Sequence, residues 1–182
     1  MEHLYYLVSQ LPAFSTDSEN SAKLPMTTES FKELCSRFMN KKDCETVKNL
    51  SLEPPKEYVP TGSAFLDEWY LKERNLRFAL AQIRAQRMKK ESKDVPMTTD
   101  GEVIQAARTA TGMDSPLSAE QFLNEYRMGV LDKIAPLDIF SVDAVYNYGL
   151  RLMLAERMRK FNRDDGLASY HKIYDEILGE KK

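Results

Sequence analysis

The sequence is poor in the residues that interrupt regular structure. Its 182 residues include only 7 glycines and 8 prolines, which gather at a few positions. A fold of many short strands needs frequent turns rich in glycine and proline, so their scarcity favours long helices. The two cysteines, Cys35 and Cys44, are too few for a disulfide framework. We expect them to be the reduced thiols of a cytosolic protein.

The chain also lacks long apolar runs and a strong charge of either sign. No segment approaches the roughly 18 consecutive apolar residues of a membrane span, and Glu2 replaces the basic start of a signal peptide. Lys and Arg (26) nearly balance Asp and Glu (28), which gives a net charge of −2. DNA-binding proteins usually carry a basic excess. We therefore expect a cytoplasmic protein, free or held peripherally at the inner face of the cell membrane, with no DNA partner.

What is present predicts an all-α fold, a compact bundle forming a single domain over residues 1–182. The pattern predicts helices over about 25–39, 43–50, 63–90, 100–111, 118–134, 141–161 and 165–178. A threonine of the Thr27–Thr28 pair is expected to cap the first of these, and Ser118 and Gln121 match a capping box for the fifth. Gly179 is expected to close the last. Residues 4–8, LYYLV, are too few for periodicity to separate a short strand from a buried helix.

The segment 63–90 carries the longest helical pattern. One seam of it follows a 3-4-3-4 spacing through Leu66, Trp69, Glu73, Leu76, Leu80 and Ile83. A second set on a different side recurs every seventh residue, at Leu71, Phe78 and Ala85. A helix that is apolar on two sides is expected to pack between neighbours.

Two short motifs recur in the same order in both halves of the chain, about 1–90 and 91–182. P-[ML]-[TS]-x-E-[SQ]-F occurs at 25–31 and at 116–122, and L-R-[FL]-x-L-A occurs at 76–81 and at 150–155. Either the two halves are related helical units, or the motifs simply reflect how helices begin and are composed. Stacked helical units more often build scaffolds than catalytic clefts.

The sequence contains no recognisable catalytic, cofactor or metal motif. Phosphate-binding glycine loops, H-E-x-x-H and G-x-S-x-G are all missing. Neither His3 nor His171 has an evident partner, and the Cys35-x8-Cys44 spacing does not suit zinc. We therefore expect no enzyme, no cofactor and no metal site.

Charged residues of the long helix are the remaining candidates for function. Glu73 interrupts the apolar seam, and Arg77 lies one turn later. This pair is either an internal ion pair of the bundle or a contact for a partner protein. Arg74, Arg77 and Arg84 lie within about 80° around the helix, and further basic residues follow to Lys90. They form either a solvated face or a site for an acidic protein, anionic lipid headgroups or nucleic acid.

The opening YYLVSQLP and the segment FLDEWYLKERNLRFALAQIRAQRM resemble an uncharacterised bacterial family associated with V-type ATPases. That family is similar to the central-stalk subunit of V/A-type ATPases that is designated C in bacteria and archaea and d in eukaryotes. The repeats of this central-stalk subunit lead from an acidic helix into an asparagine and a basic-apolar segment. Residues 73–77, ERNLR, stand in that place, with a degenerate second copy at 147–151, NYGLR. The central-stalk subunit is longer and has three repeats, whereas only two are found here.

The resemblance implies a non-catalytic subunit or accessory factor of an ion-translocating V-type ATPase. Its partners would be the central shaft and the membrane proteolipid ring, with membrane contact only through the complex. It would act either as a rotor adaptor or as an assembly or regulatory factor. The expected partner-binding residues are Glu73, Arg74, Arg77, Arg84 and Arg151. The alternative is a helical RNA- or anionic-lipid-binding module that uses the basic face of the long helix.

Overall fold

The computed structural model describes residues 2–13, 24–89, 96–159 and 163–178, and in these ranges every regular element is an α-helix. The elements in chain order are α1 (Glu2–Gln10), α2 (Thr28–Phe38), α3 (Lys41–Lys48), α4 (Ala64–Arg87), α5 (Gly101–Gly112), α6 (Pro116–Lys133), α7 (Val142–Arg159) and α8 (Arg163–Leu178). The predicted all-α fold is confirmed. Residues 4–8 belong to α1, so the short strand is wrong, and Leu7 in this helix is fully buried. Gly179, expected to close the last helix, lies outside the described residues.

The polar residues at helix starts explain where several helices begin. The Thr27 hydroxyl accepts a hydrogen bond from the Ser30 amide, and Ser63 likewise caps α4. The expected capping box at Ser118 is wrong, because Ser115 caps α6 and Pro116 occupies its first turn. Proline suits that position, since its missing N–H would have had no helical partner there.

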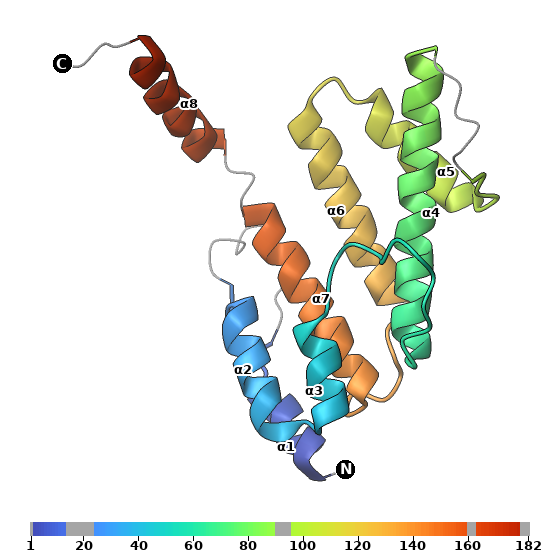
Figure 1. The fold of residues 1–182 in the computed structure, drawn as a ribbon, viewed down its shortest axis with the longest axis vertical. Helices are drawn as coiled ribbons and strands as arrows, with labels where there is room; N and C mark the ends of the chain where they lie inside the picture. Colours follow the sequence, from blue (N-terminus) through green and yellow to red (C-terminus); the bar gives the residue numbers. More distant parts are fainter. Residues whose placement is uncertain (1, 14–23, 90–95, 160–162, 179–182) are drawn as a thin grey trace.

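The bundle is organised around three long helices, α4, α6 and α7 (Figure 1). Helices α1, α2 and α3 cover the N-terminal part of α7, and α5 packs beside α4. One buried cluster joins the first three helices to α7 and to parts of α4 and α6, and includes Leu7, Phe31, Trp69, Leu131 and Leu150. A second cluster joins the later part of α4 to α5 and α6, and includes Leu76, Leu80, Val103, Ala107 and Leu123. Each cluster therefore draws helices from both halves of the chain.

The seam predicted along α4 is the face that this helix buries. Leu66, Trp69, Glu73, Leu76 and Leu80 are all buried, and Ile83 packs at the edge of the second cluster. The second apolar side is only partly covered, because Leu71 is 52% exposed. Helix α4 does pack between neighbours, against α5, α6 and α7, as expected, but Leu71 on its second apolar side is left exposed.

Gly149 sets how closely α7 approaches the helices that cover it. A Cβ added at this residue would lie 2.7 Å from Phe31 Cε1 and 2.9 Å from Leu50 Cδ2. These distances are shorter than real carbon contacts, so any larger residue would require the Phe31 and Leu50 side chains to shift. Among the described residues, no helix is both long enough and apolar enough to cross a membrane.

Candidate partner-binding site

Glu73 lies inside the bundle and is held by two arginines. Its side chain is 1% exposed, and Arg127 of α6 donates to both carboxylate oxygens, Nε to Oε2 at 2.9 Å and Nη2 to Oε1 at 3.0 Å. Arg77 adds a third hydrogen bond, Nε to Oε1 at 2.9 Å. The two arginines thus occupy both oxygens of the only charge on the buried seam of α4. The internal ion pair is confirmed, and Glu73 cannot touch a partner in this conformation.

Arg127 is the member of this network that sequence reasoning missed. It lies 54 residues from Glu73 and its side chain is 7% exposed. Its Nη1 also approaches Oδ1 of the fully buried Asn124 at 3.5 Å. The Asn124 Nδ2 has no hydrogen-bond partner within the described structure. The buried arginine on α6 and the buried acid on α4 thus form a bidentate contact between these two helices.

The basic face of α4 is largely engaged with the protein itself. Arg74 donates through Nη2 to the Pro55 carbonyl oxygen at 2.6 Å, which ties down the proline-rich connection before α4. Arg77 contacts two acids: its Nε donates to Glu73, and its Nη2 lies 3.5 Å from Oε1 of the exposed Glu53.

Near the end of α4, the side chain of Arg87 is hydrogen-bonded within the described part of the protein, whereas that of Arg84 is not. Arg87 donates to the Thr111 carbonyl oxygen at the end of α5. Arg84 is exposed, and no ion pair or hydrogen bond joins its side chain to any other described residue. Of the arginines predicted for a basic site on α4, only Arg84 is therefore not engaged by another described part of the chain.

Arg151 on α7 is arranged like Arg77 on α4. Its Nε donates to Oδ1 of Asn147, one turn earlier, at 3.3 Å, and its Nη2 pairs with Asp132 of α6. Asn147 stands at the position in the second motif that Glu73 occupies in the first. In both copies the arginine reaches back one turn to a side chain that is largely buried, and α6 supplies a charged neighbour.

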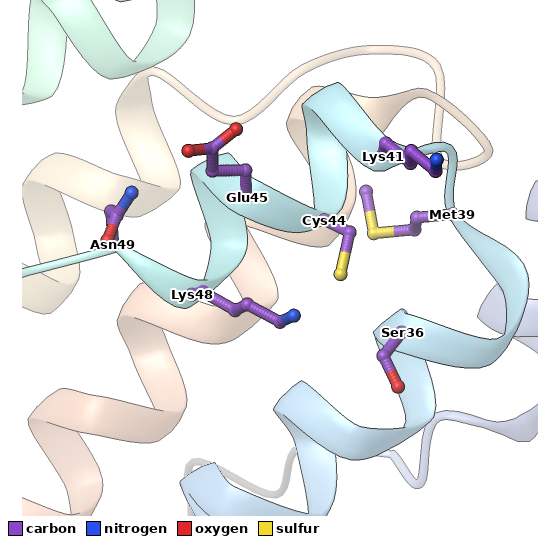
Figure 2. Close-up of a pocket in the computed structure, with 7 residues that line it drawn as sticks. All are labelled: Ser36, Met39, Lys41, Cys44, Glu45, Lys48 and Asn49. Carbon is purple, nitrogen blue, oxygen red and sulfur yellow. The ribbon is translucent and has the colours of Figure 1, made fainter.

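A shallow hollow of about 560 Å³ lies between α2 and α3 (Figure 2). Its lining includes Ser36, Met39, Lys41, Cys44, Glu45, Lys48 and Asn49. Figure 2 shows the Cys44 sulfur directed into the hollow across from Ser36. Burial raises the pKa of the neighbouring Cys35 to about 12, so that thiol stays protonated. No group of three metal-ligating side chains occurs among the described residues, and nothing in this hollow forms a nucleophile–base pair.

An exposed apolar patch lies where α1 meets the loop between α6 and α7. We call the end-patch Tyr5, Tyr6, Leu137, Ile139 and Phe140, whose side chains are 38–103% exposed. The rings of Tyr5 and Phe140 contact each other, with centroids 4.8 Å apart. Leu137 and Ile139 are exposed on the same loop as Phe140, and exposed apolar residues that gather in this way mark interaction sites in many proteins. The apolar residues after Pro136 are a signal for this patch in the sequence. The sequence analysis used Pro136 only as the end of a helix.

Comparison of the chain with protein-family models, with curated proteins and with solved structures yields no significant match. Function must therefore be inferred from the chain's own residues.

Proposed function

We propose that this protein is a non-catalytic subunit or accessory factor of a V-type ion-translocating ATPase, acting as a helical adaptor in the cytoplasm. The observation that carries the proposal is the repeated polar geometry on α4 and α7. Arg77 Nε reaches Glu73 Oε1 at 2.9 Å, and Arg151 Nε reaches Asn147 Oδ1 at 3.3 Å. This repetition supports a duplicated helical unit, which is the organisation implied by the resemblance to the central-stalk subunit.

An adaptor that transmits force needs a bundle that resists shearing between its helices. The Glu73–Arg127 pair is a directional contact between α4 and α6, and its bidentate geometry penalises any slip in register. Arg151 and Asp132 give α6 a second charged contact, with α7. Helix α6 is thereby pinned to both long helices, which supports a stiff scaffold role for the bundle.

The end-patch is the surface that we assign to a partner in the ATPase. It combines aromatic and aliphatic side chains, and aromatic residues are enriched at the centres of protein interfaces. It lies at the end of the bundle formed by α1 and the start of α7, away from α8 (Figure 1). The RNA- or lipid-binding alternative has less support, because Arg74, Arg77 and Arg87 of the basic face are engaged internally.

The test is affinity isolation of the tagged full-length chain from gently solubilised native membranes, followed by mass spectrometry. We expect V-type ATPase shaft or proteolipid-ring subunits that stay bound at about 0.5 M salt, because packed apolar contacts are screened little by ions. RNA or anionic lipid binding would instead weaken steeply with salt. Recovery of unrelated proteins or of RNA, without the ATPase subunits, would contradict the proposal.

Matched variants assign the contact to the end-patch. The double substitution L137D/I139D places two charges in the patch and is expected to remove the ATPase subunits from the isolate. The control Y58D/V59D makes the same kind of change at two other exposed apolar residues, which are 64% and 62% exposed. We expect the control to retain the partners. Equal recovery with both variants would show that the end-patch is not the contact.

A further inference from the structure

The C-terminal helix α8 stands apart from the bundle (Figure 1). It follows α7 in the chain, yet none of the principal contacts between helices involves it. Every side chain described in it, from Gly166 to Leu178, is exposed. Helix α8 therefore has no partner within the described structure that would account for its sequence.

That sequence is strongly one-sided. Its exposed large apolar residues are Leu167, Tyr170, Ile173, Tyr174, Ile177 and Leu178. At 100° per residue these six side chains fall within an arc of about 140°. Four of them follow the 3-4-3 spacing of a heptad seam, and Ile173 and Leu178 widen that seam on its two sides. A stripe of this width fits the groove between two helices better than the narrow seam of a two-stranded coiled coil.

The charges on α8 select the kind of partner. Among its described side chains, the helix carries Asp175 and Glu176 against Lys172, so their net charge is 1 − 2 = −1. Helices that lie on anionic membranes carry an excess of lysine and arginine on their polar face, whereas the acids Asp175 and Glu176 outnumber Lys172 among the described side chains of α8. A second copy of α8 would bring acidic residues against acidic residues. A groove rimmed by basic side chains is complementary to this helix.

We propose that α8 is a docking helix whose apolar stripe inserts between two helices of another protein, in a groove rimmed by lysine or arginine. Docking of an amphipathic helix into a helical groove buries anchors one and two turns apart, and Tyr170, Tyr174 and Ile177 occupy such positions. This surface lies at the opposite end of the molecule from α1 (Figure 1). The inference does not depend on the ATPase assignment, since it concerns a different surface.

The probe is a designed antiparallel helical hairpin with a leucine-lined groove, made in two versions. One version carries lysine along the groove rim, and the other carries glutamate at the same positions. Binding to the full-length protein is measured by fluorescence anisotropy of the labelled hairpin at low salt. We expect the lysine version to bind at least about tenfold more tightly than the glutamate version. Equal binding, or no binding of the lysine version, would overturn the proposal.

Two charge-matched variants locate the binding on the apolar stripe. Y174E/I177E introduces two acids into the stripe and should abolish binding of the lysine hairpin. A168E/S169E introduces the same two acids on the opposite face and should bind at least as well as the unchanged protein. Because α8 makes no principal contact with the bundle, both variants should melt at the temperature of the unchanged protein. Loss of binding in both variants would refute a stripe-specific contact.

Two other partners for the stripe, an anionic membrane and a second copy of α8, are tested with the same variants. Membrane binding would be shown by flotation with vesicles containing phosphatidylserine, and self-association by analytical ultracentrifugation. Either result would replace the proposal if Y174E/I177E removed the binding and A168E/S169E left it intact. The proposal predicts neither. Recovery of V-type ATPase subunits through the end-patch is measured separately, so either proposal can fail while the other stands.

Discussion

Substitution of Glu73 by glutamine is predicted to be the most destabilising single-charge change in the bundle. The change keeps the side-chain shape but removes the charge that faces Arg127, whose side chain is 7% exposed. Leaving a buried charge without its counter-ion costs about 3–5 kcal/mol. Arg77 is 37% exposed and can rehydrate, so its lost pair adds less than about 1 kcal/mol. We therefore expect a loss of about 3–4 kcal/mol in the free energy of unfolding.

Urea denaturation followed by circular dichroism measures this loss. The midpoint should fall while the dependence on urea stays unchanged, because the surface exposed on unfolding is the same. A double-mutant cycle with R127Q isolates the pair, and the coupling free energy should be about 2–3 kcal/mol. E33Q is the control, since the Glu33–Arg37 pair is exposed at 66% and 64% and should cost less than about 0.5 kcal/mol.

The reasoning would be refuted if E73Q cost no more than E33Q. That result would mean that Arg127 is fully hydrated in the folded protein, contrary to its burial. The reasoning would also be refuted if E73Q and R127Q were each strongly destabilising but their coupling free energy were near zero. Each residue would then matter through packing, and the bidentate ion pair would carry no stability.

Three further perturbations have expected outcomes. G149A should lower the free energy of unfolding by about 1–3 kcal/mol in urea melts, although alanine favours helices, because the added methyl overpacks the contact with α2; an unchanged or higher stability would contradict it. Hydrogen bonding to Lys72 lowers the pKa of Asp100, so this pair stabilises the fold above the unfolded carboxyl pKa and the stabilisation is lost as the pH falls through the folded pKa. D100N should therefore cost about 0.5–1 kcal/mol near neutral pH, and that cost should shrink in acid melts; a constant cost would refute the assignment. Iodoacetamide at a pH of about 8 should label Cys44 well before Cys35, because a thiol whose pKa is about 12 is almost never a thiolate there; peptide mapping that found Cys35 labelled first would contradict the burial.

Local signals allowed much of the fold to be predicted from the sequence. Thr27 and Ser63 begin helices because each side chain accepts a hydrogen bond from an amide in its own first turn, which is a relation between near neighbours. The seam of α4 follows from helical periodicity alone. The start of α6 was misplaced because Ser118 and Gln121 satisfy the capping-box spacing, whereas Ser115 followed by proline supplies the actual cap. Both local signals are present in the sequence, and the helix begins at the earlier one, where Pro116 occupies the first turn.

Long-range relations limited the prediction of the site. The sequence offers Arg77, one turn away, as an ion-pair partner of Glu73 and leaves open whether the pair is internal, but Arg127 lies 54 residues away and no local rule selects it. The same limit applies to Arg74, whose partner is a backbone carbonyl in the connection before α4. The exposure of Leu71 also depends on which helices pack beside α4. Several arginines that were predicted to bind a partner because of their charge are therefore bound to other parts of the same protein.

We propose above that the end-patch contacts a component of a V-type ATPase. The most direct measurement is photocrosslinking in the native cell, with a benzophenone amino acid at Ile139, which is 63% exposed, and at the control position Val59, which is 62% exposed. If the end-patch is the contact, position 139 should crosslink to the shaft or to the proteolipid ring, and position 59 should give none of these products. Crosslinks from position 139 to unrelated proteins only, or the same products from both positions, would contradict it.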